Sequence, residues 1–306
     1  MINKKIIIGS RASKLALNYA ERAKNEICSK LNIKEKNLEI KKITTEGDKI
    51  KDVRLSDTGG KGLFSKTIEN ELLNNKIDIA VHALKDMPSD ETSGLITNCF
   101  LERNDPREVL ISRDKKKFND LNKGSIIGTS SFRREFQFKR IRNDLKYKLI
   151  RGNVDTRIKK LNEKNFDAII LSFAGLHSLK LDQNITQIFS TSEIIPSAGQ
   201  GTIALQCREN DGEIIKILKK INHELTYKCV IAERDVLKTL NGDCETPVGV
   251  FAYIKNNELN LETELFSLDG KDRFYESLST ELKNFKKIGL EVGTILKKKS
   301  KNSYKR

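Results

Sequence analysis

Four arginines lie close to two short apolar segments in the middle of the chain. The sequence reads Ile-Ile-Gly-Thr-Ser-Ser-Phe-Arg-Arg at 126–134 and Leu-Ile-Arg-Gly-Asn-Val-Asp-Thr-Arg at 149–157. Each apolar segment is typical of a strand, and the small polar residues after it are typical of a helix start. Helix N-termini favour anions, and guanidinium groups bind carboxylate or phosphate through paired hydrogen bonds. We predict that a substrate with several negative charges binds Arg133, Arg134, Arg151 and Arg157. A solvated basic face is the competing interpretation.

Two further charged residues, Lys85 and Asp86, follow the strand-like segment 77–81. In open α/β sheets, ligands bind beyond the carboxyl ends of the strands, where Arg11 and Ser13 also fall. A carboxylate among arginines can stabilise a cation that develops on a substrate, and it can transfer a proton. Asp86 is therefore a candidate catalytic residue, although a turn or helix-capping role fits the sequence equally well.

The five cysteines are odd in number and far apart, without a Cys-x-x-Cys pair, which argues against a disulfide framework or a zinc site. Four lie in apolar periodic segments and are expected to be buried: Cys28, Cys99, Cys207 and Cys229. Cys244 instead lies in the polar loop Gly-Asp-Cys-Glu-Thr-Pro, so we expect it to be accessible. An accessible thiol near positive charge can form a covalent attachment. An inert surface thiol is the alternative, and none of the three histidines has a recognisable setting for a Cys–His nucleophile.

The elements that must position these residues alternate between strand and helix, which predicts α/β lobes with parallel strands. The first lobe comprises residues 1–101 and 202–219, and its strands are expected at about 4–9, 38–45, 77–81 and 201–207. The second lobe comprises residues 107–195, with strands near 108–112, 125–129, 146–150 and 166–171. Two such lobes would face each other across a cleft.

The pattern changes at about residue 223 to a helix followed by three alternating strands. We predict a small α+β third domain over 223–306 with a three-stranded antiparallel sheet, and Cys244 belongs to it. Its strands are expected at about 248–254, 259–266 and 273–279, joined by Asn-Asn and Asp-Gly turns and closed by a helix over 281–297.

Two segments are polar or basic enough to be predicted outside the packed units. The segment 46–62 ends in Gly-Gly-Lys-Gly and has few residues that could anchor a core, so we expect a mobile lid that includes Lys61. The run Lys297–Arg306 is the densest basic stretch, and a frayed tail is expected there.

The composition narrows the class of protein. The 306 residues suffice for two or three domains, and 37% hydrophobic with 32% charged residues is ordinary for a soluble protein. No apolar run approaches the ~20 residues that span a bilayer, and no secretory signal opens the chain, so we expect a cytoplasmic protein without membrane attachment. The net charge of +15 fits nucleic-acid binding, but no aromatic–basic platform accompanies it. Solvated lysines are favoured, and no nucleic-acid partner is expected.

Eight motifs, in the same order along nearly the whole chain, resemble the porphobilinogen deaminase (hydroxymethylbilane synthase) family. They are Gly-Ser-Arg-Ala-Ser at 9–13, Gly-Gly-Lys-Gly-Leu-Phe at 59–64, Val-His-Ala-Leu-Lys-Asp-Met-Pro at 81–88, Glu-Arg-Asn-Asp-Pro-Arg at 102–107, Gly-Thr-Ser-Ser-Phe-Arg-Arg at 128–134, Arg-Gly-Asn-Val-Asp-Thr-Arg at 151–157, Gly-Gln-Gly at 199–201, and Asp243-Cys244 with Pro247.

The resemblance implies a transferase of tetrapyrrole (haem) biosynthesis. Such an enzyme joins four porphobilinogen molecules head to tail to give hydroxymethylbilane, with loss of ammonia and an azafulvene intermediate at each step. It implies a dipyrromethane cofactor held by a thioether to Cys244, and catalysis by Asp86. The positions implied to bind cofactor and substrate are Arg11, Ser13, Lys85, Thr129, Ser131, Arg133, Arg134, Arg151 and Arg157. It further implies two lobes like those of periplasmic binding proteins, a monomer, and uroporphyrinogen-III synthase as a candidate downstream partner.

The residues themselves agree with this chemistry, because each porphobilinogen adds an acetate and a propionate, and buried carboxylates need cationic partners. One position departs from the family pattern. Ser178 stands where the family commonly carries an arginine, and the nearby Lys180 lacks the fork geometry of a guanidinium. A non-catalytic binding module for polycarboxylate anions is the main alternative function, and it would need neither Asp86 nor Cys244.

Overall fold

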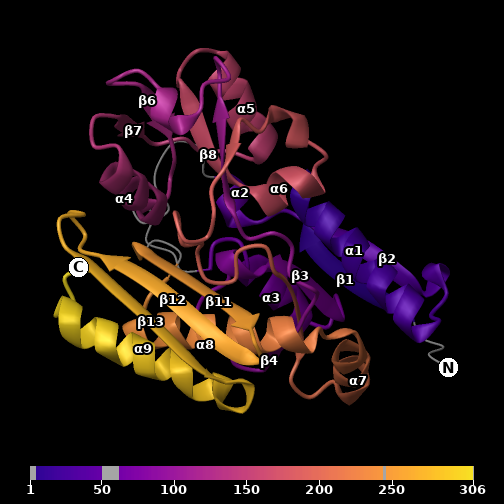
Figure 1. The fold of residues 1–306 in the computed structure, drawn as a ribbon. Coiled ribbons are helices and arrows are strands. Elements are labelled where there is room, and N and C mark those ends of the chain that lie inside the picture. The colour runs from indigo at the N-terminus through magenta and orange to yellow at the C-terminus, as the bar shows by residue number, and fades with distance from the viewer. Residues whose placement is uncertain (1–4, 50–61, 244–245, 306) are drawn as a thin grey trace.

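Three β-sheets with packed helices make up the part of the chain that the structure describes, and Figure 1 shows their arrangement. The computed structural model describes residues 5–49, 62–243 and 246–305. The sheets have five, five and three strands, and their strands fall within the ranges predicted for the two α/β lobes and the small α+β domain. The predicted fold class is therefore confirmed, while the domain boundaries stay predictions. Within the described residues, no helix is both long and apolar enough to cross a bilayer.

The sheet of the first lobe has the order β2-β1-β3-β10-β4. Its strands are β1 (Ile6–Arg11), β2 (Leu38–Ile43), β3 (Ile79–Ala83), β4 (Leu95–Phe100) and β10 (Ile203–Arg208). Alternate residues of a strand point to opposite faces. Ile79 and Val81 accordingly share a core with α1 (Lys14–Leu31) and α7 (Gly212–Ile221), whereas Ala80 packs with α3 (Lys66–Leu73). Helices thus cover both faces of this sheet.

The sheet of the second lobe has the order β7-β6-β8-β5-β9. Its strands are β5 (Glu108–Ser112), β6 (Ile126–Gly128), β7 (Lys146–Lys148), β8 (Ala168–Ser172) and β9 (Gln187–Ile188). Helix α4 (Phe132–Ile141) packs on one face through Phe138, and α5 (Val154–Asn162) with α6 (Phe173–Ser178) packs on the other through Leu161 and Leu176. Helices α4, α5 and α6 follow β6, β7 and β8 along the chain, so each of these helices starts near the end of its preceding strand.

Both lobe sheets are mixed, so the prediction of parallel strands was only partly correct. Strands β1, β2 and β3 are parallel, but β10 is antiparallel to β3 and β4. In the other lobe β6 is parallel to β7 and β8, but β5 is antiparallel to β8 and β9. The cause is the chain path: β10 enters the first sheet on its return from the second lobe, and periodicity in the sequence carries no information on strand direction.

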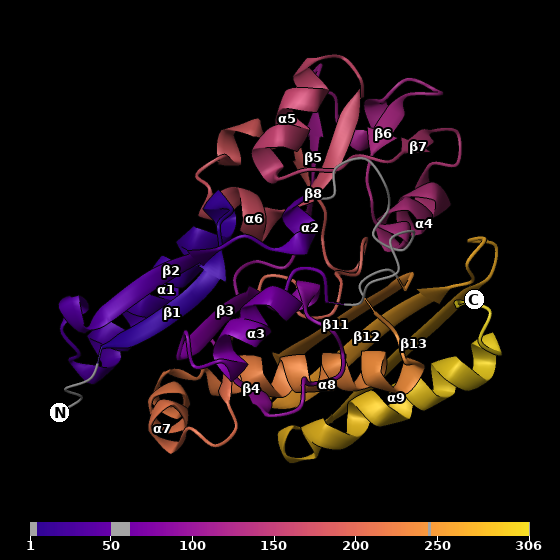
Figure 2. The same cartoon turned by 180° about the vertical axis from the view of Figure 1, so that it is seen from behind.

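The third domain pairs β11 (Val248–Lys255), β12 (Glu258–Phe266) and β13 (Arg273–Glu281) in antiparallel fashion, as predicted. The turn residues Asn256 and Asn257 both have positive φ, which suits a two-residue hairpin. Helices α8 (Glu224–Leu240) and α9 (Phe285–Ser300) lie side by side against the sheet. The view from behind in Figure 2 shows the first lobe and this domain next to each other, and the second lobe lies above both of them, as it also does in Figure 1.

One buried ion pair holds the third domain against the lobes. Arg103, in the segment between β4 and β5, donates to Glu233 of α8 at 2.6 Å. The same carboxylate accepts from the backbone of Gly199 at 2.6 Å and from that of Ala252 in β11 at 2.8 Å. Glu233 thereby joins the third domain to both segments that connect the two lobes.

The predicted frayed tail is wrong. Helix α9 continues to Ser300, and the Tyr304 side chain is only 1% exposed. Its hydroxyl donates to the Leu240 carbonyl at 2.9 Å, and the Lys297 ammonium donates to the Thr239 carbonyl at 3.3 Å. The segment is basic in composition, but it contains a buried tyrosine whose hydroxyl binds a carbonyl in the last turn of α8.

The predicted lid is described only in part. Helix α2 (Glu46–Lys49) begins it, and the Gly47 amide donates to the Leu63 carbonyl at 3.1 Å. Lys61 and the residues at 50–60 lie outside the described residues. The lid therefore stays a prediction.

We expect Tyr304→Ala to lower the free energy of unfolding by ~3–5 kcal/mol, because it leaves a cavity and removes a buried hydrogen bond. Tyr275→Ala is the matched control, since that ring is 43% exposed, and a change of ~0.5 kcal/mol or less is expected. Urea unfolding followed by circular dichroism measures both. Equal losses in the two variants would show that the C-terminal segment contributes no specific packing.

Candidate active site

Most of the predicted site residues line one cleft where the three domains meet. The cleft has a volume of about 880 Å³. Nine predicted residues line it, namely Arg11, Ser13, Lys85, Asp86, Ser131, Arg133, Arg134, Arg151 and Arg157. The third domain contributes Leu237, Asp243, Thr246 and Val248. A single cavity therefore unites residues from the N-terminal strand, both lobes and the third domain.

At least three helices begin at this cleft. Ser13 caps α1, where its hydroxyl accepts from the Ala16 amide at 3.3 Å, and Ser131 caps α4 in the same way with the Arg134 amide at 3.4 Å. The first turn of α5 lines the cleft from Gly152 onward. Each start presents amide N–H groups and a positive dipole end. The sequence predicted two such ends around the arginines, and α1 adds a third from the opposite lobe.

On the side of the first lobe, the Arg11 guanidinium carbon lies 4.0 Å from the centre of the Phe64 ring. Stacking of this kind fixes a guanidinium plane while leaving its edge able to bind an anion. A smaller pocket of about 50 Å³ shares Arg11, Ser13 and Asp86 with the cleft and is also lined by Tyr19. Burial, and then the Asp86 charge, raise the pKa of Tyr19 to about 12, so its hydroxyl stays protonated at neutral pH.

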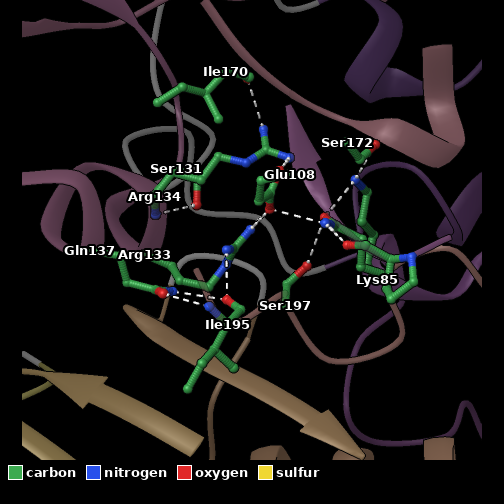
Figure 3. Close-up of polar contacts among 12 residues, drawn as sticks. Lys85, Glu108, Ser131, Arg133, Arg134, Gln137, Ile170, Ser172, Ile195 and Ser197 are labelled. Carbon is green, nitrogen blue, oxygen red and sulfur yellow. Dashed lines mark hydrogen bonds and ion pairs between the residues drawn. The ribbon is translucent and has the colours of Figure 1, made fainter. Parts of the chain in front are cut away.

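On the side of the second lobe, a buried carboxylate lies between two of the predicted arginines (Figure 3). Glu108 is fully buried, and its oxygens lie 2.6 Å from Arg133 Nη2 and 2.8 Å from Arg134 Nη2. Burial alone would raise the pKa of Glu108, but the charges of Arg134 and Arg133 lower it to about 2. The carboxylate is thus ionised at any physiological pH, and the two arginines are partly neutralised inside the protein.

Gln200 connects this group to the first lobe. Its amide nitrogen donates to Glu108 at 2.9 Å, and its amide oxygen accepts from the Lys85 ammonium at 3.3 Å. Lys85 also makes a long contact of 3.5 Å with the Ser172 hydroxyl of the other lobe. Burial, followed by the charge of Arg134, lowers the pKa of Lys85 to about 8. With this pKa, Lys85 begins to lose its proton just above neutral pH.

The remaining two arginines lie at α5. Arg157 Nε donates to the Gly152 carbonyl at 2.8 Å, which bends the side chain back over the first turn of the helix. Burial, then the charges of Arg134 and Arg151, lower the pKa of Arg157 to about 10. Arg157 thus stays charged at neutral pH, with burial as the main cause of its lowered pKa and the neighbouring cations as the second.

Some predicted residues lie elsewhere. Thr129 is buried and does not line the cleft; its hydroxyl accepts from the Ser131 amide at 3.2 Å and so shapes the turn before α4. Ser178 ends α6 with its hydroxyl donating to the Ala174 carbonyl at 2.8 Å. Lys180 is exposed and does not line the cleft. Cys244, like Lys61, lies outside the described residues, although Asp243 and Thr246 on either side of it line the cleft.

Sequence analysis missed Glu108, Gln200, Tyr19 and the ring of Phe64 as parts of this site. Glu108 had one available signal, because a carboxylate opens a strand whose other residues are mostly apolar and predicted to be buried. Gln200 lies in the Gly-Gln-Gly motif at 199–201, and the sequence offered no specific role for its side chain.

The fold and the cleft define a class of protein: two α/β lobes joined by crossing segments, with a cationic cleft closed by a third domain. A family model described as porphobilinogen deaminase, dipyromethane cofactor binding domain, matches residues 6–216, and the C-terminal domain model of that family matches residues 227–298. The chain belongs to the porphobilinogen deaminase family.

Curated relatives agree along almost the full length. The chain is 44% identical over 298 residues to the porphobilinogen deaminase of Geobacillus sp. (strain WCH70), covering 96% of this chain and 94% of that protein. It is 41% identical to that of Alkaliphilus metalliredigens, covering 97% and 93%. A solved substrate binding domain of a putative amino acid ABC transporter from Streptococcus pneumoniae matches 71% of this chain and 92% of its own, at 14% identity and a TM-score of 0.44.

Proposed function

We propose that this protein is a porphobilinogen deaminase, which joins four porphobilinogen molecules head to tail into hydroxymethylbilane and releases one ammonia per unit added. One observation carries the proposal. The Asp86 carboxylate lines a cleft whose other charged groups are mainly cations from both lobes. Such a cleft suits a polycarboxylate on which one transient positive charge must be stabilised.

The cations would bind the acetate and propionate groups of the pyrroles. Arg11 would bind from the first lobe, with its plane fixed by Phe64, while Arg151 and Arg157 would bind from the second. The starts of α1, α4 and α5 add amide N–H groups to the same surface. Because the cations come from opposite walls, a bound pyrrole is oriented as well as attracted.

Asp86 would act on the charge that appears when ammonia leaves. The C–N bond electrons depart with nitrogen from the protonated aminomethyl group, and the remaining methylene-pyrrole unit becomes cationic. The positive charge lies on the ammonium nitrogen before the step and on the pyrrole ring with its methylene carbon after it. A carboxylate closer to the ring than to the leaving nitrogen stabilises the second arrangement more, which accelerates the step. After the new C–C bond forms, the attacked ring must lose a proton, which Asp86 can accept.

The residues of the cleft fit a dipyrromethane cofactor with its four carboxylates, because the volume is large and the lining is cationic. Arg133, Arg134, Arg151 and Arg157 would hold it, and the thiol of Cys244 would attach it by a thioether. The position of Asp243 and Thr246 in the cleft lining supports that attachment. When bound, the cofactor supplies the nucleophilic pyrrole carbon that receives the first substrate.

Intact mass spectrometry of the purified protein should find it heavier than its sequence by two linked pyrrole units. We expect Cys244→Ser to abolish this addition, because the thioether cannot form. Cys28→Ser is the control, since Cys28 is half-buried on α1 and away from the cleft lining, and it should keep the addition. An unmodified wild-type protein with full turnover would exclude the attachment, and an unmodified inactive one would favour the anion-binding alternative.

Asp86→Asn should lower kcat at least about a hundred-fold, because an amide cannot neutralise the developing cation or accept the proton. The circular dichroism spectrum should be unchanged. Asp90→Asn is the matched control, because Asp90 is an exposed carboxylate four residues along the chain. Product formation measured from porphobilinogen decides the matter, and near-normal turnover by Asp86→Asn would assign the catalytic role to another group.

Ser178→Arg should lower KM about ten-fold, equivalent to ~1.4 kcal/mol, with kcat nearly unchanged. Ser178 is adjacent in sequence to Leu179, which lines the cleft. The Ser178 carbonyl, which accepts from Asn18 at 2.6 Å, is kept by the substitution. Ser178→Lys is the comparison variant, and a smaller gain is expected because lysine lacks the fork geometry. Steady-state kinetics in which neither variant changes KM would show that no carboxylate contact is missing.

A further inference from the structure

Glu108 is a fully buried carboxylate beside the cleft, and its place in the reaction is not yet assigned. One oxygen accepts from Arg133 Nη2 at 2.6 Å and from Gln200 Nε2 at 2.9 Å, and the other lies 2.8 Å from Arg134 Nη2. A carboxylate with no solvent exposure is strongly unfavourable without such partners. Its three partners therefore depend on it as much as it depends on them.

The two arginines are each fixed from a second side by a backbone carbonyl. Arg133 Nη1 donates to Ile195 at 2.9 Å, and Arg134 Nη1 donates to Ile170 at 3.2 Å. Both side chains are at least nine-tenths buried, yet both line the cleft. Consecutive residues of a helix point about 100° apart, so a shared anion is needed to bring the two guanidinium groups together.

The hydrogen bonds continue from Glu108 to the catalytic side of the cleft. Gln200 donates to both Glu108 and the Pro106 carbonyl, at 2.9 and 2.7 Å, which leaves its amide oxygen directed at the Lys85 ammonium. Lys85 is adjacent in sequence to Asp86, and both line the cleft. The nitrogen and the oxygen of the Gln200 amide are both hydrogen-bonded, so its orientation is fixed by Glu108 and Pro106 on one side and Lys85 on the other. A change at Glu108 can therefore alter the hydrogen bond to Lys85.

We propose that Glu108 is a positioning residue, which aligns Arg133 and Arg134 with the cleft and, through Gln200, holds Lys85 as a cation beside Asp86. This inference rests on the proposed function, because it concerns how the same cleft stays charged between substrates. Glu108 touches no substrate and acts only through its partners.

The charges that face Lys85 define the expected effect. Arg134 and Arg133 lower the pKa of Lys85, whereas Asp86 and Glu108 raise it, and burial accounts for the largest lowering. Neutralising Glu108 removes one of the two carboxylates that favour the charged amine. Lys85 should then lose its proton at a lower pH, and carboxylate binding that needs this cation should weaken at that lower pH.

The test compares the holoenzyme with Glu108→Gln by competitive acetylation of Lys85 with acetic anhydride, read by peptide mass spectrometry across pH 6–11. We expect the midpoint to lie about one unit lower in the variant than in the wild type. The alkaline limb of kcat/KM for porphobilinogen should move in the same direction. The labelling needs no turnover, so it separates a failure of this inference from a failure of the proposed function.

Two further variants serve as controls. Glu108→Asp keeps the charge and should keep the Lys85 midpoint. Asp167→Asn removes a carboxylate that pairs with Arg113 at 2.9 Å in the same lobe and does not line the cleft, and it too should leave the midpoint unchanged. If Glu108→Gln does not fold, the double variant Glu108→Gln/Arg133→Gln removes one buried cation together with the carboxylate, so the net buried charge is unchanged. A smaller downward shift is expected for it, because Glu108 influences Lys85 more than Arg133 does.

An unchanged midpoint together with an unchanged alkaline limb in a folded Glu108→Gln protein would overturn the proposal. Glu108 would then serve only to attach α4 to β5, and the loss would appear in stability alone. A midpoint shift of equal size in Asp167→Asn would overturn it as well, because the effect would then be general to the lobe.

Discussion

The cleft must hold several positively charged side chains close together even when no ligand is bound to neutralise them. Arg133, Arg134 and Lys85 lie around one buried carboxylate, and removing Glu108 from such a group typically costs about 3–5 kcal/mol. The pKa values of Lys85 and Arg157 are still lowered, because burial and neighbouring cations both disfavour the charged forms of these side chains. The protein thus keeps most of the positive charge that its ligand needs while neutralising the part that would otherwise prevent folding.

The segment that returns from the second lobe to the first supplies the contacts that hold this arrangement. The Ile195 carbonyl accepts from Arg133, the Pro196 carbonyl accepts from Val250 of the third domain, and Gln200 joins both lobes. Gly201 has positive φ, and a Cβ atom there would lie 2.5 Å from a carbonyl of the other crossing segment. The close approach of the two segments therefore requires glycine, and it brings three domains to one cavity.

Sequence alone predicted the parts of the site that local rules govern. Strand ends followed by helix starts located the arginines, Lys85 and Asp86, because both signals are short-range. Glu108 could not be found in this way, since its partners lie 25 and 92 residues away and only the fold brings them together. The direction of β10 and the burial of Tyr304 were missed for the same reason: each is decided by where the chain returns, not by its local pattern.

The charge of the cleft also limits how a growing oligomer can be held. Among the described residues, eight cationic side chains line it, and two of them already share Glu108. Six linked pyrrole units, two of cofactor and four of substrate, would carry twelve carboxylates, so not every carboxylate can be paired with a cation. An unpaired carboxylate is stable only where water reaches it. Carboxylates beyond those that the cations and the helix starts of the cleft bind would therefore lie where water reaches them.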